Sequence, residues 1–337
     1  MRQLVRLTLM MLSTFSMAGL HADAALVKRP EVQQFIKQMV GQHGFKQQEI
    51  VAYLKAAEFQ PKIIESMERP YEKKSWDVYR DLFLTQNRLE AGIQFWQANQ
   101  AALEQAQKKY GVPASVIVAI LGVETLYGKR QGEYRVLDAL TTLAFDYPKR
   151  APFFTKELAE YFLLCREQGV APTQYIGSYA GAIGQPQFMP SSYRFYAVNG
   201  TGKRGIDLVN QNEDVIASVA NYFHKHGWKT NQLVAKPANI VGSQYKKIQV
   251  NSRQPNYTYR QLRALGVRSD SAKAMQKAGL IELATNRGEE YWIAYPNFYV
   301  ITRYNSSPQY ALVVYLLSQQ LQNRWVALHG NKKPSYV

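Results

Sequence analysis

The stretch PASVIVAILGVETLYG, residues 113–128, contains a single charged side chain, Glu124. Pro113 suits the first turn of a helix and Gly128 suits its end, so the stretch predicts an apolar helix over about 113–127. A helix that is apolar all round is a core element. Loss of hydration in such a helix favours the protonated form of a carboxyl group, which predicts a pKa for Glu124 above the ordinary value of about 4.3.

Two interpretations of Glu124 follow from this setting. A carboxylic acid that keeps its proton near neutral pH can serve as a general acid, as in glycosidases. A structural glutamate that bonds a backbone group or pairs with Arg or Lys would have a similar sequence context. The helix alone leaves both open.

The first 24 residues predict a secretory signal peptide. Arg2 and Arg6 precede an apolar run that is too short for a good membrane span, and the small-residue pattern Ala22-Asp23-Ala24 follows it. Cleavage after Ala24 would leave 313 of the 337 residues. We therefore expect a periplasmic protein without a membrane anchor. No cysteine stands directly after the apolar run, at the processing site, so no lipid-attachment site is expected.

The formal charge of +16 predicts attraction to an anionic polymer. Basic residues are scattered along the chain, and an exported protein seldom meets nucleic acid, so the acidic groups of the cell wall are the expected partner rather than DNA or RNA. The single cysteine, Cys165, cannot form an internal disulfide. It shares a helical face with Leu158, Tyr161 and Phe162, which predicts a buried core thiol.

The predicted fold class is mainly α (α+β). A helical hairpin follows the signal, and residues 75–111 predict a helical stretch rich in aromatic side chains. Further helices are expected at about 137–146, 151–168, 212–226 and 308–327. Between about 229 and 290, β-forming segments such as YKKIQVNS and EEYWIAY alternate with Pro, Asn and Gly, which predicts a small inserted β-containing subdomain.

Two further segments carry candidate binding residues. YIGSYAGAIGQPQFMPSSY, residues 175–193, has no charged residue and combines three glycines with amides and hydroxyls, which suits either a bound polar ligand or a tight helix crossing. PNFYVITRYNSSPQY, residues 296–310, places Tyr304, Asn305 and Tyr310 around the turn before the last helix. Tyrosine offers a flat face and a hydroxyl for a sugar ring.

In order and spacing, the motifs GVETLYG, SYAGAIGQPQFMPSSY, SVANYFHKHGW and NFYVITRYN resemble the lytic murein transglycosylase B family. The resemblance extends from about residue 30 to the end of the last helix. It implies a lysozyme-like helical core with an extra N-terminal helical region. It also implies cleavage of the β-1,4 bond between N-acetylmuramic acid (MurNAc) and N-acetylglucosamine (GlcNAc) without water, which leaves 1,6-anhydroMurNAc ends and requires no cofactor.

The resemblance also assigns roles to residues. Glu124 matches the single catalytic acid/base, Ser178 the active-site serine and Gln187 the glutamine that contacts saccharide. The remaining substrate-binding candidates are Tyr79, Tyr222, Tyr304, Tyr310, Asn305 and Arg150, the last as part of a basic pair with Lys149. The implied domain limits are 1–24 for the signal, 25–75 for the N-terminal helical region, 76–228 with 291–337 for the core, and 229–290 for the β-containing insertion.

The chain departs from the family pattern in three places. It lacks the lipobox cysteine that lipoprotein members carry. Pro186 stands in GQPQF where a relative would have a further glycine, which predicts a stiffer turn. The family can also bear a calcium loop after the SSY segment, matched here by NGTGKRGIDLVN, residues 199–210. Lys203 and Arg204 occupy this loop and Asn210 ends it, so we expect no metal site.

Two alternatives to a lytic transglycosylase remain. A hydrolytic muramidase would need a second carboxylate or a held water, and a non-catalytic peptidoglycan-binding protein would have no use for an acid in an apolar helix. Peptidoglycan glycan strands are the expected partner in each case. The sequence identifies no partner among cell-wall synthesis or division proteins.

Overall fold

The computed structural model describes residues 25–68, 74–270 and 275–330. The predicted signal peptide lies outside these residues. The described residues form two compact units, which divide between residues 59 and 60. No helix of the described residues is long and apolar enough to cross a membrane.

The first unit contains the predicted helical hairpin. Helix α2 spans Pro30–His43 and α3 spans Gln47–Lys55. Gly44 ends α2 in the left-handed conformation, with φ 68°, which glycine adopts without steric cost. The buried side chains of α2 are those with helical spacing, namely Val32, Phe35, Ile36 and Met39.

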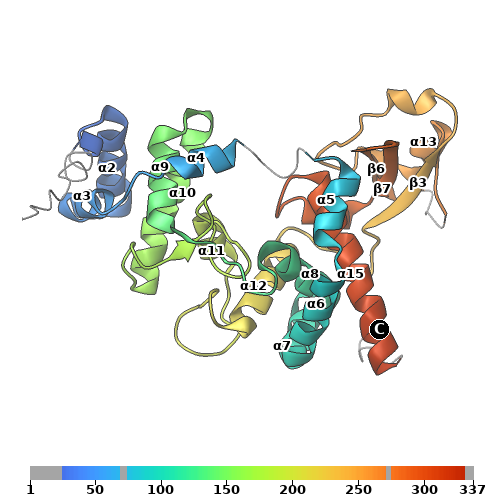
Figure 1. Cartoon of the computed structure of the whole chain (residues 1–337), viewed down its shortest axis with the longest axis horizontal. Helices are drawn as coiled ribbons and strands as arrows, with labels where there is room; N and C mark the ends of the chain where they lie inside the picture. The colour runs from blue at the N-terminus through green and yellow to red at the C-terminus, as the bar shows by residue number, and fades with distance from the viewer. Residues whose placement is uncertain (1–24, 69–73, 271–274, 331–337) are drawn as a thin grey trace, which may run out of the picture. The chain divides into compact units, whose positions relative to one another are not determined.

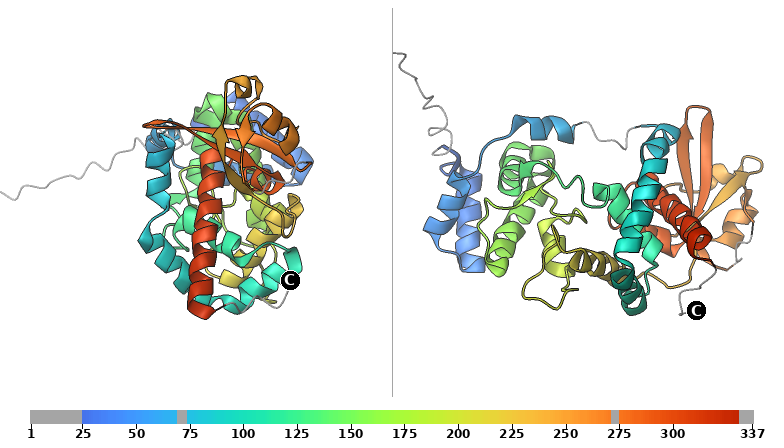
Figure 2. Two further views of the ribbon diagram at one scale, coloured as in Figure 1. Left: turned by 90° about the vertical axis from the view of Figure 1, so that its right-hand side faces the viewer. Right: turned by 60° about the horizontal axis from the view of Figure 1, so that its bottom comes forward.

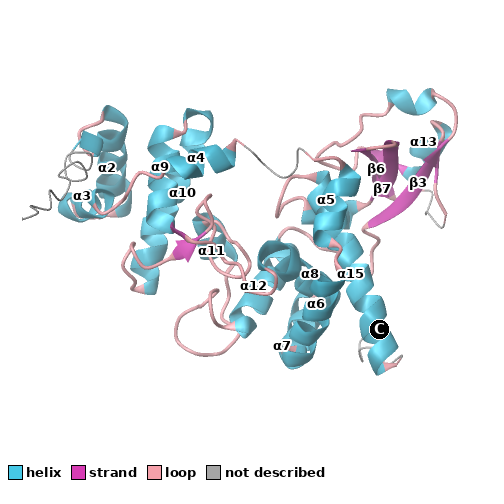
Figure 3. Ribbon diagram, in the orientation of Figure 1, coloured by secondary structure: helices cyan, strands magenta, loops and turns pink. Residues whose placement is uncertain are grey.

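The second unit is mainly helical, as predicted (Figures 1 and 3). Its α-helices are α4 (Pro61–Met67), α5 (Trp76–Phe83), α6 (Gln86–Ala98), α7 (Gln100–Tyr110), α8 (Ala114–Thr125), α9 (Val136–Asp146), α10 (Ala151–Gln168), α11 (Pro190–Tyr196), α12 (Asn212–Lys225), α13 (Tyr259–Ala264), α14 (Pro296–Ile301) and α15 (Pro308–His329). The stretch expected to be helical over 75–111 is three helices. Thr85 separates the first two, because its side chain accepts the Arg88 N–H at 3.3 Å and so caps α6.

Helix α8 lies in the core of this unit. Every residue from Ala114 to Val123 is buried, which fits its apolar sequence. Helix α15 packs along α8 and also contacts α6 (Figure 2). Helices α9 and α10 pack against each other, and Cys165 on α10 is a buried free thiol, as predicted. Helices that are distant from each other in sequence, α6 and α15, therefore surround α8.

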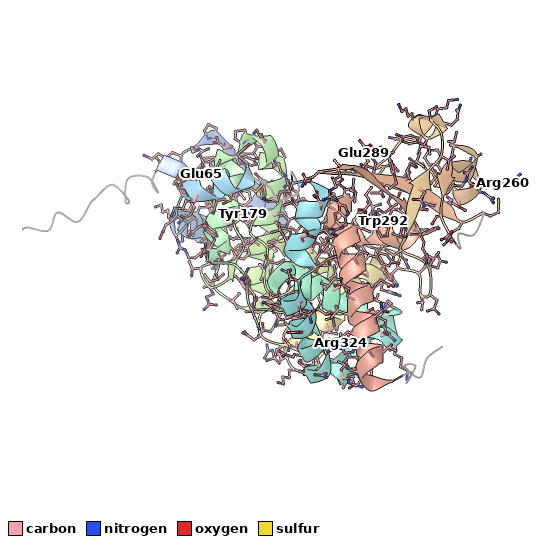
Figure 4. All side chains as sticks on the ribbon, turned by 45° about the vertical axis from the view of Figure 1, so that its right-hand side comes forward. Glu65, Tyr179, Arg260, Glu289, Trp292 and Arg324 are labelled. Atoms are coloured by element: carbon pink, nitrogen blue, oxygen red, sulfur yellow. The ribbon has the colours of Figure 1, made fainter. Side chains whose placement is uncertain are left out.

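The strands between 235 and 294 form one antiparallel sheet with the order β4-β6-β7-β3-β5. Their bounds are β3 (Ala235–Ile240), β4 (Tyr257–Thr258), β5 (Val267–Arg268), β6 (Lys277–Thr285) and β7 (Gly288–Ala294). Leu262 of α13 joins Leu280 and Ile293 of the sheet in one buried cluster. Figure 4 shows Trp292 on this sheet and Arg324 on α15.

A second, two-stranded sheet positions the glycine-rich segment. Strand β1 (Tyr134–Arg135) pairs antiparallel with β2 (Ile176–Gly177), with Tyr134 opposite Gly177. A Cβ on Gly132 would lie 2.0 Å from the Gly177 carbonyl oxygen, so the two backbones meet where only glycine fits. This pairing joins the chain that follows α8 to the segment that contains Ser178.

Candidate active site

Glu124 lies in the last turn of α8 and is half-buried. The helix ends at Thr125, three residues before Gly128, so the predicted end at about residue 127 is wrong. Leu126 and Tyr127 both adopt positive φ, at 50° and 59°, ahead of Gly128 at 82°. Two successive non-glycine residues with a left-handed backbone conformation are energetically unfavourable, and such backbone strain is most common at functional sites.

Tyr310 bonds the carboxyl group of Glu124. Its hydroxyl donates to Glu124 Oε1 from the first turn of α15, and the Tyr310 side chain is almost fully buried. Burial and the negative charge on Glu124 raise the pKa of Tyr310 well above its usual value of about 10. Tyr310 therefore remains a neutral donor to this one oxygen at any working pH.

Tyr304 also lies close to the carboxyl group. Burial first, and the charge on Glu124 second, raise the pKa of Tyr304 well above its usual value. Its hydroxyl donates to the Pro186 carbonyl oxygen at 2.6 Å, which joins the turn before α15 to the glycine-rich segment. The ring of Tyr222 lies 4.8 Å from that of Tyr304, and the Tyr222 hydroxyl donates to the Arg303 carbonyl oxygen at 2.6 Å.

The glycine-rich segment folds into tight turns held by its own polar groups. Ser178 Oγ accepts the N–H groups of Ala180 and Ala182, at 3.3 and 3.1 Å. Gln187 has φ 51°, and its Nε2 donates to the carbonyl oxygens of Gln131 and Gly184, at 3.0 and 2.9 Å. Both side chains are half-buried, and their bonds hold the turns of this segment together.

The remaining candidates differ in their placement. Asn305 is half-buried, and its Oδ1 accepts the Ser307 N–H at 3.0 Å. Tyr79 on α5 is 1% exposed and contributes to the raised pKa of Tyr310, so it lies near that tyrosine. Arg150 is exposed in the turn Pro148–Arg150 between α9 and α10, with its guanidinium 4.4 Å from the centre of the Phe153 ring. The contacts above join Glu124 to the tyrosines but do not include Arg150.

Sequence reasoning included Gln185 among the polar groups of the glycine-rich segment but missed Thr125 and the bond that joins the two residues. Thr125 Oγ1 donates to the Gln185 carbonyl oxygen at 2.8 Å and accepts the Gly128 N–H at 3.0 Å. A Cβ on Gly128 would lie 2.9 Å from the side chain of Gln185. The residue after Glu124 thus fastens α8 to the glycine-rich segment. The only sequence signal for this link is the hydroxyl of Thr125 in an otherwise apolar helix end.

Comparison with known proteins gives a consistent result. A transglycosylase SLT domain matches residues 28–319. Membrane-bound lytic murein transglycosylase B of Escherichia coli (strain K12) is 40% identical over 301 residues, which cover 86% of this chain and 82% of that protein. The structure of soluble lytic transglycosylase SltB1 of Pseudomonas aeruginosa has 42% identity and a TM-score of 0.82, covering 88% of this chain and 99% of that one.

A third related structure, the Escherichia coli lytic transglycosylase Slt35 in complex with calcium, has 40% identity and a TM-score of 0.79, covering 88% of this chain and 94% of that one. The chain therefore belongs to the family of transglycosylase SLT domain proteins. Within it, this protein is a lytic murein transglycosylase of the B type, and the lysozyme-like fold class predicted from sequence is confirmed.

The calcium in a related structure raises the question whether the loop 199–210 fits a cation. Calcium needs oxygen ligands that point inward. Here the loop itself uses both ends of the Asn199 amide: Nδ2 donates to the carbonyl oxygens of Lys203 and Gly205, the latter at 2.7 Å, and Oδ1 accepts the Gly202 N–H at 2.6 Å. The residues present do not fit calcium. Among the described residues, no group of three His, Cys, Asp or Glu side chains could hold a metal ion.

The loop differs from the sequence interpretation in one respect. A carboxylate does close it, but that carboxylate is Asp214 rather than a residue at position 210. Asp214 is 1% exposed and accepts the N–H groups of Gly200, Thr201 and Asp207, at 2.7, 3.0 and 2.9 Å. Its oxygens therefore bond the backbone of the loop and hold it closed.

We expect calcium to leave the melting temperature unchanged. A ligand that binds the native state selectively raises the melting temperature as its concentration exceeds the Kd, and the loop offers calcium no such site. Thermal melts in calcium, in magnesium and in chelator should superimpose. A rise that calcium alone produces at micromolar concentration would show that the loop binds the ion.

Proposed function

We propose that Glu124 is the sole acid and base of this lytic transglycosylase and that it cleaves the MurNAc-β-1,4-GlcNAc bond. The observation that carries the proposal is the bond from Tyr310 to Glu124 at the end of a buried helix. A protonated Glu124 whose Oε1 accepts this bond holds its proton on the other oxygen, which can give it to the glycosidic oxygen. Tyr304 and the glycine-rich segment border the same group.

The reaction then needs one carboxyl group because the substrate supplies the rest, a known exception to paired-carboxylate catalysis. Glu124 gives its proton to the glycosidic oxygen as the bond to the MurNAc anomeric carbon breaks. The N-acetyl oxygen of MurNAc bonds that carbon and forms an oxazolinium-like ion. The Glu124 carboxylate takes the proton of the C6 hydroxyl, and O6 attacks the same carbon and displaces the N-acetyl oxygen. No water is consumed, and the product carries a 1,6-anhydro ring.

The other candidates are proposed to bind and orient the glycan. Ser178 and Gln187 lie in the glycine-rich turns, and Tyr304 joins the turn before α15 to the same segment through its bond to the Pro186 carbonyl oxygen. Orientation of the reacting groups can lower the barrier by several kcal/mol, about 7 in well-aligned systems. We propose that Tyr79 supports this end of the site from its buried position near Tyr310, and that Arg150 meets acidic groups further along the strand.

The same proposal covers domains and location. We propose an N-terminal helical region over 25–75, a catalytic core over 76–228 and 291–337, and an insertion over 229–290. The five-stranded sheet supports an insertion there, and its strand β7 continues to Ala294, four residues past the proposed limit. A predicted signal peptide and a cell-wall substrate support a periplasmic location, with peptidoglycan glycan strands as the partner.

Product analysis tests the reaction. Digestion of purified sacculi should give muropeptides with 1,6-anhydroMurNAc ends, which are one water lighter than reducing ends in a mass spectrum. Reducing ends alone would identify a hydrolytic muramidase. Binding without any cleavage would identify a non-catalytic peptidoglycan-binding protein.

We expect kcat/KM to fall as pH rises, because Glu124 must be protonated when the glycosidic bond breaks. The nearby tyrosines do not produce this fall, since the pKa values of Tyr304 and Tyr310 lie well above 10. The measurement is the pH profile of kcat/KM, with sacculus binding by the inactive Glu124→Gln variant across the same range. A profile flat to about pH 8, with binding also flat, would exclude Glu124 as the general acid.

A further inference from the structure

The strained end of α8 raises the question of what holds Glu124 in place. Left-handed conformations at Leu126 and Tyr127 are strained and persist only where the surroundings impose them. The last carbonyl groups of a helix also lack partners within it. Both features fall within two residues or so of Glu124, so contacts made there bear directly on the position of its carboxyl group.

Residues of α6 hold the side chain of Tyr127 in place. Its hydroxyl donates to the Arg88 carbonyl oxygen at 2.9 Å, and its ring stacks on Phe95 at 5.6 Å. The hydroxyl occupies a slot between two glycines, because a Cβ on Gly92 or Gly122 would lie only 2.4 or 2.5 Å from it. Burial raises the pKa of Tyr127, so the hydroxyl keeps its proton and remains a donor.

Arg88 bonds the end of α8 itself. Its Nε donates to the Gly122 carbonyl oxygen at 3.0 Å, one of the carbonyls left without a helical partner. Its Nη1 donates to the carbonyl oxygens of Leu82 and Phe83, at 2.9 and 2.7 Å, and its guanidinium lies 5.1 Å from the Phe83 ring centre. One side chain thus ties the end of α5, the start of α6 and the last turn of α8 together.

We propose that Arg88 and Tyr127 are positioning residues that fix the last turn of α8 and thereby aim the carboxyl group of Glu124 at the glycosidic oxygen. Neither side chain needs to touch the substrate. The inference rests on the proposed role of Glu124. A displacement of about 1 Å in a catalytic group can lower the rate about 100-fold. A fixed helix end next to Glu124 would prevent such a displacement.

The test compares kcat and KM on a defined glycan for Tyr127→Phe and Arg88→Lys. Tyr127→Phe removes one hydroxyl, and Arg88→Lys keeps the charge but loses the planar fork that reaches three carbonyls. We expect kcat to fall about 5-fold and about 10-fold or more, respectively, with KM within about twofold of wild type. Arg88→Met also loses the charge and the remaining donor, so its kcat should be lower than that of Arg88→Lys.

Two matched variants control for stability. Tyr161 of α10 donates its hydroxyl to the Pro172 carbonyl oxygen at 2.6 Å. Arg268 of β5 donates through Nη1 to the carbonyl oxygens of Arg263 and, at 3.3 Å, of Val267. Tyr161→Phe and Arg268→Lys make the same chemical changes elsewhere, and we expect wild-type kcat from both. All assays are run well below the melting temperature of each variant.

The outcomes separate this inference from the proposed function. A wild-type kcat in folded Arg88→Lys and Tyr127→Phe, an equal loss in the matched controls, or a change in KM alone would overturn the positioning role. If Arg88→Lys does not fold, Tyr127→Phe decides by the same criteria. Absence of anhydro products from the wild-type protein would instead overturn the proposed reaction, whatever the variants show.

Discussion

Glu124→Gln is expected to lower kcat on purified sacculi by about 1,000-fold or more, because general acid–base catalysis contributes up to about 10⁴-fold and this group performs both steps. Glutamine keeps the shape of the side chain and can accept the bond from Tyr310. It has no acidic proton to give and cannot take one back. The measurement is the release rate of soluble muropeptides.

Two controls accompany this variant. Its melting temperature and its binding to sacculi should match the wild-type protein, since glutamine fills the same space at the end of α8. Activity within tenfold of wild type, in a sample free of wild-type protein, would remove Glu124 from the mechanism.

The second large effect concerns stability. Asp214→Ala is expected to lower the free energy of unfolding by about 3 kcal/mol or more, because three backbone N–H groups lose their acceptor and each buried unsatisfied group costs about 1–3 kcal/mol. These are the N–H groups of Gly200, Thr201 and Asp207. Urea unfolding at neutral pH measures the change as a shift of the midpoint.

Asp207→Ala is the matched control, because the Asp207 carboxylate also accepts backbone N–H groups, those of Val209 and Asn210, but Asp207 is half-buried rather than buried. Asp207→Ala should lower the free energy of unfolding by about 1 kcal/mol or less, since water can replace part of the hydrogen bonding that the Asp207 carboxylate provides. Equal midpoints for the two alanine variants would mean that the Asp214 carboxylate does not hold the loop.

The sequence predicted what local patterns determine. The spacing of apolar residues and the residues typical of helix ends predicted the buried helix α8 with its single carboxyl group. The same signals predicted helices α9, α10, α12 and α15. The breaks at Thr85 and Asn99 were missed because their flanking segments continue the helical pattern. The small sheet was predicted from alternating β-formers, but its strand order depends on pairings between segments that a local pattern does not contain.

The candidate site shows the same division. The family motifs pointed to Tyr310 as a binding residue, but its bond to Glu124 joins residues 186 positions apart and depends on the packing of α15 against α8. Leu126 and Tyr127 adopt left-handed conformations that their side chains disfavour. A sequence pattern would assign such a conformation to Gly128 instead, because glycine is the usual left-handed residue after a helix. The slot for the Tyr127 hydroxyl requires glycines on two different helices, which no spacing rule relates.

The central claim is that one carboxyl group and the C6 hydroxyl of the substrate complete the reaction without water. Digestion of sacculi in water enriched in ¹⁸O tests it directly, with mass spectrometry of the new MurNAc ends. The account predicts 1,6-anhydro ends that carry no ¹⁸O. New reducing ends with one ¹⁸O atom each would show that water attacks the anomeric carbon, and would contradict the account.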